Sequence, residues 1–129
     1  MANNLKIPVN YQTVMPYLIV AGAEKFISFM QNVFDAKETY KAMRDEHTIM
    51  HGELMIGDST IMFADSTDNY TVRNAGMFVY VDDADATFKK AIKAGASIIN
   101  EMADQSYGRS GGVQDPFGNI WWITSAPAD

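Results

Sequence analysis

The feature that most constrains this chain is a hydrophobic pattern that occurs twice along its length. In each half, a strand-like apolar run precedes a segment with apolar residues at helical spacing, and three more strand-like runs follow. The first half gives a strand at 14–20, a helix at 23–34, and strands at 37–43, 48–56 and 59–65. The second half gives a strand at 76–81, a helix between Ala84 and Gly95, and strands at 96–100, 107–114 and 119–125. The repeated order βαβββ predicts an α+β fold built from two tandem modules.

A polar segment at 66–74 separates the two repeats and is typical of a linker. We therefore expect a single domain over 1–129, with module one at about 12–65 and module two at about 75–125. A chain of 129 residues can bury a core without disulfides or a structural metal. It has no cysteine, which excludes thiolate chemistry and zinc ribbons.

The charge and hydropathy of the chain limit its partners. The formal net charge of −6 argues against a nucleic-acid partner, since phosphate binding needs clustered Lys and Arg side chains. The acidic balance mildly favours cationic ligands, although solubility is the simpler explanation for it. No apolar run approaches the length of a membrane span, and Met1–Asn10 lacks the pattern of a signal peptide. We therefore expect a cytoplasmic protein that does not contact a membrane.

Five segments in a characteristic order carry a family resemblance. They read MPYLIV, FISFMQNVFDAKE, MHGELMIGDSTIMFAD, VDDADATFKKAIKAGA and DQSYGRSGGVQDPFGNIWW. Together with the repeated βαβββ order, they resemble the vicinal oxygen chelate superfamily (glyoxalase, bleomycin-resistance and dioxygenase proteins), and within it the PhnB-like, or 3-demethylubiquinone-9 3-methyltransferase-like, group. The resemblance implies curved mixed sheets around a cup, the glyoxalase-like fold. It also implies a homodimer, because cups in this superfamily are often completed by a partner module.

The resemblance also marks four positions at which metal-dependent members carry His, Gln or Glu ligands. Matching motif to motif, these positions hold Met15, Met62, Gly76 and Trp122 in this chain. None of these residues supplies the imidazole nitrogen or carboxylate oxygen that Mg²⁺, Zn²⁺ or Ni²⁺ sites use. We therefore expect the fold without the metal site, and no other cofactor.

Strand alternation indicates which side chains line the cup. Successive residues of a strand point to opposite faces. The face that carries the positions matched to metal ligands is therefore rich in aromatic and thioether side chains. These side chains are predicted to bind the ligand and comprise Tyr17, Met62, Phe78, Tyr80 and Trp122. The alternative is a second, filled core. Trp121 falls on the opposite face and is expected to pack against the helices.

The segment HGEL places two titratable side chains on the same face. If Gly57 and Asp58 close a two-residue hairpin, Glu53 lies opposite Met62 and His51 lies on the same face two residues away. Glu53 is then a candidate base or a partner for a cationic group, with His51 assisting. The alternative is a mutually satisfied polar pair at the edge of the cup.

The Gly-rich segment 104–112 is the most loop-like part of the second half. Tyr107 can stack on a ligand or donate a hydrogen bond to it. Arg109 offers a planar, permanently charged fork that suits a carboxylate or phosphonate. A salt bridge across the hairpin is the alternative role for Arg109.

The prediction that follows is a PhnB-like protein that binds a small aromatic or cationic molecule in an apolar cup, without the superfamily's metal. Two alternatives stay open. The first is a metal-independent or atypical lyase or isomerase that uses Glu53 as its base. The second is a drug-sequestering protein of the bleomycin-resistance type.

Overall fold

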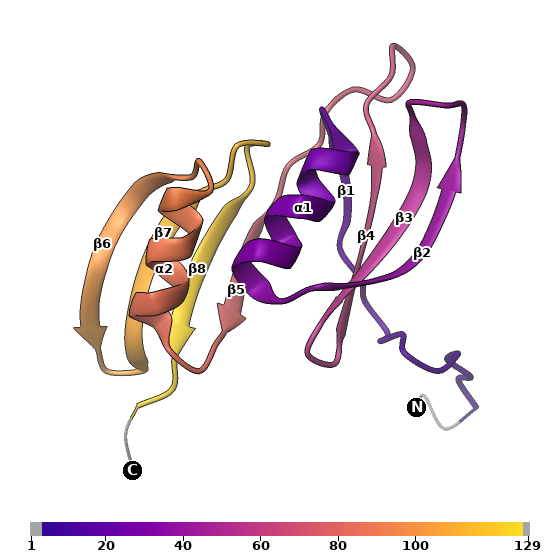
Figure 1. Cartoon of the computed structure of the whole chain (residues 1–129). Coiled ribbons are helices and arrows are strands. Elements are labelled where there is room, and N and C mark those ends of the chain that lie inside the picture. Colours follow the sequence, from indigo (N-terminus) through magenta and orange to yellow (C-terminus); the bar gives the residue numbers. More distant parts are fainter. Residues whose placement is uncertain (1–3, 128–129) are drawn as a thin grey trace.

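The computed structural model describes residues 4–127, and Figure 1 shows the whole chain. The first half contains β1 (Tyr17–Val20), α1 (Ala23–Phe34), β2 (Lys37–Met43), β3 (Ile49–Ile56) and β4 (Ser59–Asp65). The second half contains β5 (Gly76–Tyr80), α2 (Ala84–Lys93), β6 (Ser97–Gln105), β7 (Gly108–Gln114) and β8 (Ile120–Ser125). The predicted order βαβββ, repeated twice, is confirmed.

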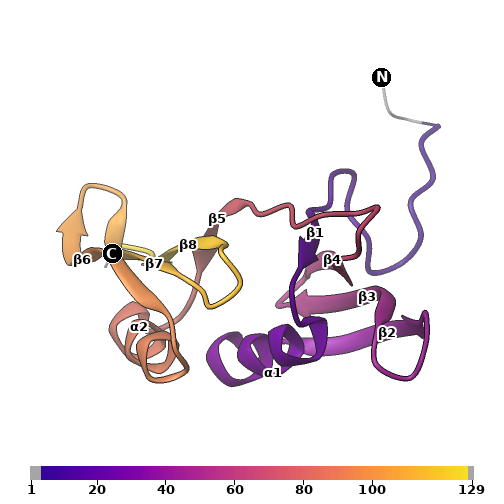
Figure 2. The ribbon, with the colours of Figure 1, turned by 90° about the horizontal axis from the view of Figure 1, so that it is seen from above.

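The strands form two mixed sheets of four strands each. The first sheet has the order β1-β4-β3-β2 and the second the equivalent order β5-β8-β7-β6. In each sheet one pair, β1 with β4 or β5 with β8, is parallel, and the other pairs are antiparallel. Both helices cover the same side of the two sheets, and the linker from β4 to β5 runs along the opposite side (Figure 2). We call the uncovered side of each sheet its open face.

The helices form where the sequence pattern places them, and local signals set their ends. In α1, Phe26, Met30 and Val33 are buried against the first sheet. Asp83 caps α2, because its side chain accepts a hydrogen bond from the backbone N–H of Ala86 at 3.1 Å. Gly95 follows α2 with a φ of 108°, a conformation that side chains other than glycine rarely adopt. Neither helix in the described part of the chain has the length and apolar character needed to span a bilayer.

Aromatic contacts join the two halves of the chain. The ring of Phe117, in the turn before β8, lies 5.5 Å from Phe26 and 6.1 Å from Phe29. The ring of Phe34, at the end of α1, lies 4.8 Å from that of Trp121. Trp121 is 1% exposed, so its predicted place in the core is confirmed.

The turn before β8 is organised around the buried carboxylate of Asp115, which is 3% exposed. One carboxylate oxygen accepts hydrogen bonds from the backbone N–H groups of Phe117 and Asn119, both at 2.9 Å. The other accepts from the Asn119 side chain at 3.1 Å and from the indole N–H of Trp121 at 2.8 Å. The DPFGN motif is therefore a hydrogen-bonded clamp that fixes the start of β8.

Some predicted element boundaries were wrong. The first strand begins at Tyr17 rather than Val14, because Pro16 has no N–H to contribute to a ladder. The strand expected at 96–100 runs on to Gln105 as β6, so the segment 104–112, predicted to be the most loop-like, is a turn only between the end of β6 and the start of β7. Gly111 and Gly112 serve β7 by leaving room for neighbouring side chains, so glycine here indicates close packing rather than a flexible loop.

Replacing Asp115 by Ala removes the acceptor of four hydrogen bonds in the interior. We expect the free energy of unfolding to fall by roughly 3 kcal/mol or more, since one hydrogen bond to a charged group is worth about 1.5–3 kcal/mol. Denaturant titration followed by near-UV circular dichroism measures the change. Asp58→Ala, in the exposed turn between β3 and β4, is the control and should stay within about 0.5 kcal/mol of the parent. Equal effects of the two substitutions would contradict the clamp.

Candidate functional site

The open face of the first sheet gathers the candidate residues of the first half. Across strands, Glu53 is opposite Met62, and Met62 is opposite Tyr17 on its other side. The hairpin pairing of Ile56 with Ser59 that placed them together is confirmed. Gly57 has a φ of 56°, as the first central residue of a two-residue hairpin turn requires.

A continuous chain of hydrogen bonds crosses this face. The hydroxyl of Tyr17 lies 3.0 Å from Nδ1 of His51, and Nε2 of His51 lies 2.7 Å from Oε2 of Glu53. The hydroxyl of Tyr11 donates to Oε1 of Glu53 at 2.7 Å. Glu53 is only 6% exposed, and each of its oxygens has a partner. The pair of Glu53 and His51 is therefore satisfied within the protein, and Tyr17, 49% exposed, is the end of the chain that faces solvent.

Sequence reasoning did not find Tyr11, which lies in a polar segment with no strand or helix pattern. Its segment is bound to β4 because the Gln12 side chain both donates to the carbonyl of Thr60 at 2.9 Å and accepts from its N–H at 3.1 Å. The hydrogen bond to Glu53, followed by burial, raises the pKa of Tyr11 above its ordinary value. A buried carboxylate needs hydrogen-bond donors. In the sequence, this requirement of Glu53 was the signal that a donor such as a tyrosine lies near it.

The open face of the second sheet is aromatic. The ring of Phe78 lies 5.1 Å from Tyr80 and 6.1 Å from Tyr107, and these three side chains are 48–64% exposed. Trp122 is paired with Phe78 across β5 and β8 and is half-buried. Its indole lies over Gly112 of β7, where a Cβ atom would overlap the ring. The predicted placement of Trp121 and Trp122 on opposite faces is confirmed.

The four positions that the resemblance matches to metal ligands hold side chains that do not suit a metal. The pairing of Tyr17 with Met62 matches the pairing of Phe78 with Trp122, so Met62 and Trp122 occupy equivalent places in the two sheets. Neither side chain offers an imidazole nitrogen or a carboxylate oxygen, nor do Met15 and Gly76. Within residues 4–127, no cluster of three or more His, Cys, Asp or Glu side chains has a geometry that could hold a metal ion.

Three of the candidate residues, Tyr17, Phe78 and Tyr80, line pockets. A pocket of about 430 Å³ lies between the two halves and is lined by Phe78 and Tyr80 of β5 together with Gln12, Pro16 and residues 56–61. A second pocket, of about 380 Å³, lies on the open face of the first sheet. Its lining comprises Tyr17, Ile19, Arg44, Met50, Ala64, Asp65 and Tyr70. Within one chain, Tyr17 therefore belongs to one pocket and the aromatic residues of β5 to the other.

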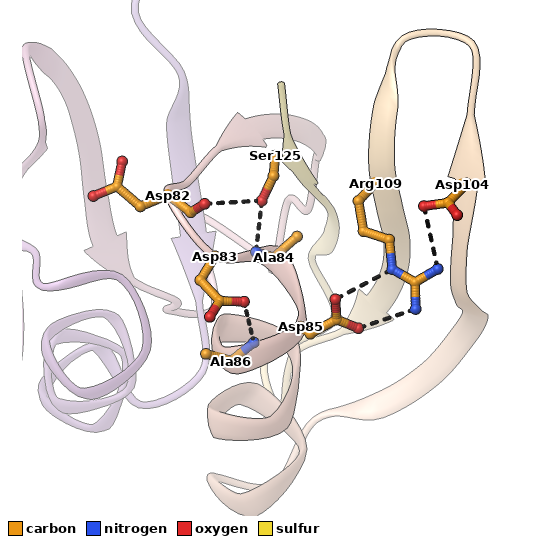
Figure 3. A network of polar contacts seen from close by, with 8 residues as sticks. All are labelled: Asp82, Asp83, Ala84, Asp85, Ala86, Asp104, Arg109 and Ser125. Atoms are coloured by element: carbon orange, nitrogen blue, oxygen red, sulfur yellow. Dashed lines mark hydrogen bonds and ion pairs between the residues drawn. The ribbon is translucent and has the colours of Figure 1, made fainter. Parts of the chain in front are cut away.

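Arg109 is engaged in ion pairs (Figure 3). Its Nε and one terminal nitrogen each lie 3.2 Å from a carboxylate oxygen of Asp85 on α2, and its other terminal nitrogen lies 3.4 Å from Asp104. The contact with Asp104 spans the β6–β7 hairpin, which is the alternative that the sequence left open. The hydrogen bond from Arg109 holds the pKa of Asp85 below its ordinary value. A role for Arg109 in ligand binding stays a prediction, and it would compete with these pairs.

Comparisons with known proteins agree with this architecture. The profile of the Glyoxalase/Bleomycin resistance protein/Dioxygenase superfamily matches residues 11–123. An uncharacterized protein of Mycobacterium bovis is 32% identical over 118 residues, which cover 82% of this chain and 78% of that protein.

Solved structures share the fold at low identity. A putative 3-demethylubiquinone-9 3-methyltransferase, PhnB protein, from Bacillus cereus has a TM-score of 0.73 at 22% identity and covers 89% of this chain and 100% of its own. TnmS3, described as an antibiotic binding protein from a Streptomyces species, has a TM-score of 0.70 at 16% identity, covering 95% and 98%.

Replacing Gly112 by Ala forces the Trp122 indole away from β7. We expect a loss of about 1–3 kcal/mol in unfolding free energy, the usual cost of overpacking, and an altered near-UV circular dichroism of tryptophan. Gly76→Ala is the matched control, because a Cβ atom there meets nothing within 4 Å. The cost of Gly112→Ala should disappear when Trp122 is also replaced by Ala. A cost that survives in the double variant would show that Trp122 does not lie over this glycine.

The ion pair of Arg109 with Asp85 predicts a dependence of stability on pH. Because the folded-state pKa of Asp85 is lowered, the pair stabilises the fold above the ordinary pKa of aspartate. This contribution is lost as the pH falls through the lowered value. Arg109→Gln should therefore be less stable than the parent at neutral pH, with the difference closing in acid. Thermal unfolding over a pH series measures this, with Lys25→Gln on exposed α1 surface as the control. A difference that is constant with pH would contradict the assignment.

Proposed function

We propose that this chain, which belongs to the Glyoxalase/Bleomycin resistance protein/Dioxygenase superfamily, binds a small aromatic or cationic molecule on the open faces of its sheets. The observation that carries the proposal is the cluster of Phe78, Tyr80, Tyr107 and Trp122 on the second sheet. Phe78, Tyr80 and Tyr107 are about half exposed or more, and Trp122, which is half-buried, is paired with Phe78 across β5 and β8. Exposed aromatic clusters of this kind mark binding surfaces, since leaving them in water is unfavourable.

The arrangement of the rings suits a flat ligand. The ring planes of Phe78 and Tyr80 meet at 72°, close to perpendicular, and the ring of Tyr107 is tilted by 52° from that of Phe78. A ligand ring can pack edge-to-face against such side chains, a geometry that aromatic pairs favour. The same ring faces attract cations, and the net charge of −6 supports a cationic ligand at longer range.

Sequestration of a drug-like molecule is a second candidate. Phe78, Tyr80, Tyr107 and Trp122 offer aromatic surface and two tyrosine hydroxyls, which suits binding by packing and hydrogen bonding. TnmS3, which shares the fold, is described as an antibiotic binding protein. This candidate differs from the first only in the size of the ligand and in the role of binding, which is to sequester the ligand.

An enzyme that uses Glu53 as a base is the third candidate. The hydrogen bond between Glu53 and His51 supports it, because a carboxylate orients an imidazole in many acid–base sites. Both oxygens of Glu53 already have partners, however, so proton transfer to a ligand would run through His51 rather than directly.

We further propose that the protein is a cytoplasmic homodimer in which a partner's sheet completes each cup. The separation of Tyr17 from Phe78 and Tyr80 into two pockets of one chain supports this, because a single small ligand cannot contact both pockets there. The absence of cysteine from the sequence is compatible with a reducing compartment.

A series of naphthalene derivatives tests the binding proposal: 2-naphthylmethanol, 2-naphthylmethylammonium and 2-naphthoate differ chiefly in charge. We expect the first two to bind in calorimetric titrations and Trp122→Ala to weaken them about tenfold, equivalent to about 1.4 kcal/mol. Static light scattering of the same solutions should give the mass of a dimer.

Ile98→Ala, at an exposed position of β6, is the control for the loss of apolar surface and should leave these affinities unchanged. Equal affinities in Trp122→Ala and the parent would contradict the aromatic site. A monomeric mass would contradict the shared cup.

A further inference from the structure

The pocket on the open face of the first sheet combines an exposed phenol with a permanent cation. Tyr17 of β1 lines it from one side, and Arg44, in the turn that joins β2 to β3, lines it from another. Ile19, Met50 and Ala64 supply apolar surface between them. The pocket volume of about 380 Å³ is suited to a single-ring molecule.

A β-bulge shapes this pocket. Ala42 of β2 is paired with His51 and Met43 with Ile49, so Met50 is the extra residue of β3. The bulge keeps Ile49 in the core while it turns Met50 to the open face, beside His51. Bulges re-aim side chains in this way next to functional sites.

The charges that line the pocket are not equivalent. Asp65 is committed to the fold, because its two carboxylate oxygens accept the backbone N–H groups of Ala23 at 2.8 Å and Ile49 at 2.7 Å. Arg44 forms no ion pair with any residue among 4–127. A guanidinium is always charged and presents several donors, so the lining retains a cation that can accept a ligand anion.

Behind Tyr17 lies a proton-accepting system. With a proton on Nε2, His51 donates to the Glu53 carboxylate at 2.7 Å, and its Nδ1 accepts from the Tyr17 hydroxyl at 3.0 Å. Tyr11 holds the other oxygen of Glu53 at 2.7 Å, so the carboxylate cannot turn away from the imidazole. A buried carboxylate that orients a histidine, which in turn contacts a hydroxyl, is the arrangement by which proteins activate a hydroxyl group.

We infer that this pocket binds small, weakly acidic phenols or enols and removes their proton through Tyr17 and His51. The O–H bond of the ligand breaks as its proton moves to the Tyr17 oxygen, and the Tyr17 proton moves to Nδ1 of His51. The products are a ligand oxyanion, a neutral Tyr17 and an imidazolium that donates to Glu53. No electrons are exchanged and no further reactant is needed. Arg44 pairs with the oxyanion, and Glu53 and Tyr11 are positioning residues.

This inference rests on the proposed function only in that a small molecule must bind an open face of the sheets. It assigns to the first sheet a ligand chemistry that differs from aromatic packing on the second. It also moves the point of proton exchange from Glu53, which is buried, to Tyr17, which is exposed.

The experiment uses 4-nitrophenol, whose anion has its own visible absorption band, in a buffer below the probe's own pKa so that the free probe is neutral. Calorimetry measures binding and absorbance measures the ionised fraction of the bound probe. We expect the parent protein to bind the probe and to increase its ionised fraction at least tenfold. Binding without ionisation overturns the inference and leaves the proposed function standing. Absence of binding up to the solubility limit overturns the inference, whereas the naphthalene series tests the proposed function separately.

Variants separate the roles of the residues. Tyr17→Phe should retain binding within about threefold, a difference of about 0.7 kcal/mol, and lose the ionised band. Glu53→Gln should reduce the ionised fraction through its effect on His51, and Arg44→Gln should reduce both binding and ionisation. Tyr40→Phe is the matched control, because the Tyr40 ring lies 6.0 Å from that of His51 and its hydroxyl is not part of the chain. Ionisation that persists in Tyr17→Phe, or is lost equally in Tyr40→Phe, overturns the role of Tyr17.

Discussion

The arrangement of both halves depends on the hydrogen bonds that the buried carboxylate of Asp115 accepts. The carboxylate fixes the turn before β8 through backbone N–H groups, and it holds the indole of Trp121 in the core. Phe34 of α1 packs against that indole, and Phe117 of the same turn packs against α1. With Trp121 held inward, strand alternation turns Trp122 to the open face. One carboxylate thereby links the contact between the halves to the placement of a candidate ligand-binding side chain.

The two open faces have different chemistry although their backbones are equivalent. The first carries a hydrogen-bonded chain from Tyr17 to Tyr11 through an imidazole and a buried carboxylate. The second carries aromatic rings in mutual contact and no charged group among its clustered residues. A ligand that met both faces would find hydrogen bonding and charge on one side and aromatic surface on the other.

The sequence predicted what periodicity and local turns control. The two helices, the hairpin register at Gly57 and the opposite orientations of Trp121 and Trp122 follow from spacing alone. What could not be predicted depends on contacts distant along the chain. The hydrogen bond between Tyr11 and Glu53 spans 42 positions of the sequence, and no sequence pattern near Tyr11 predicts it. The contact of Arg109 with Asp85 requires knowing that α2 lies beside β7, and the bulge at Met50 breaks the alternation on which the face assignments rely.

One difference between equivalent positions accounts for much of the divergence of the two faces. Glu53 is opposite Met62 in the first sheet, and Gly112 is opposite Trp122 in the second. Where the carboxylate of Glu53 is present, it forms hydrogen bonds with His51 and Tyr11, and this polar chain lies beside the flexible thioether of Met62. At Gly112 the side chain is only a hydrogen atom, so the indole of Trp122 has room to lie across β7. A Cβ atom at Gly112 would exclude that packing, so the aromatic surface depends on the missing side chain as the polar chain depends on Glu53. A duplicated module can in this way keep one backbone and carry two kinds of binding surface.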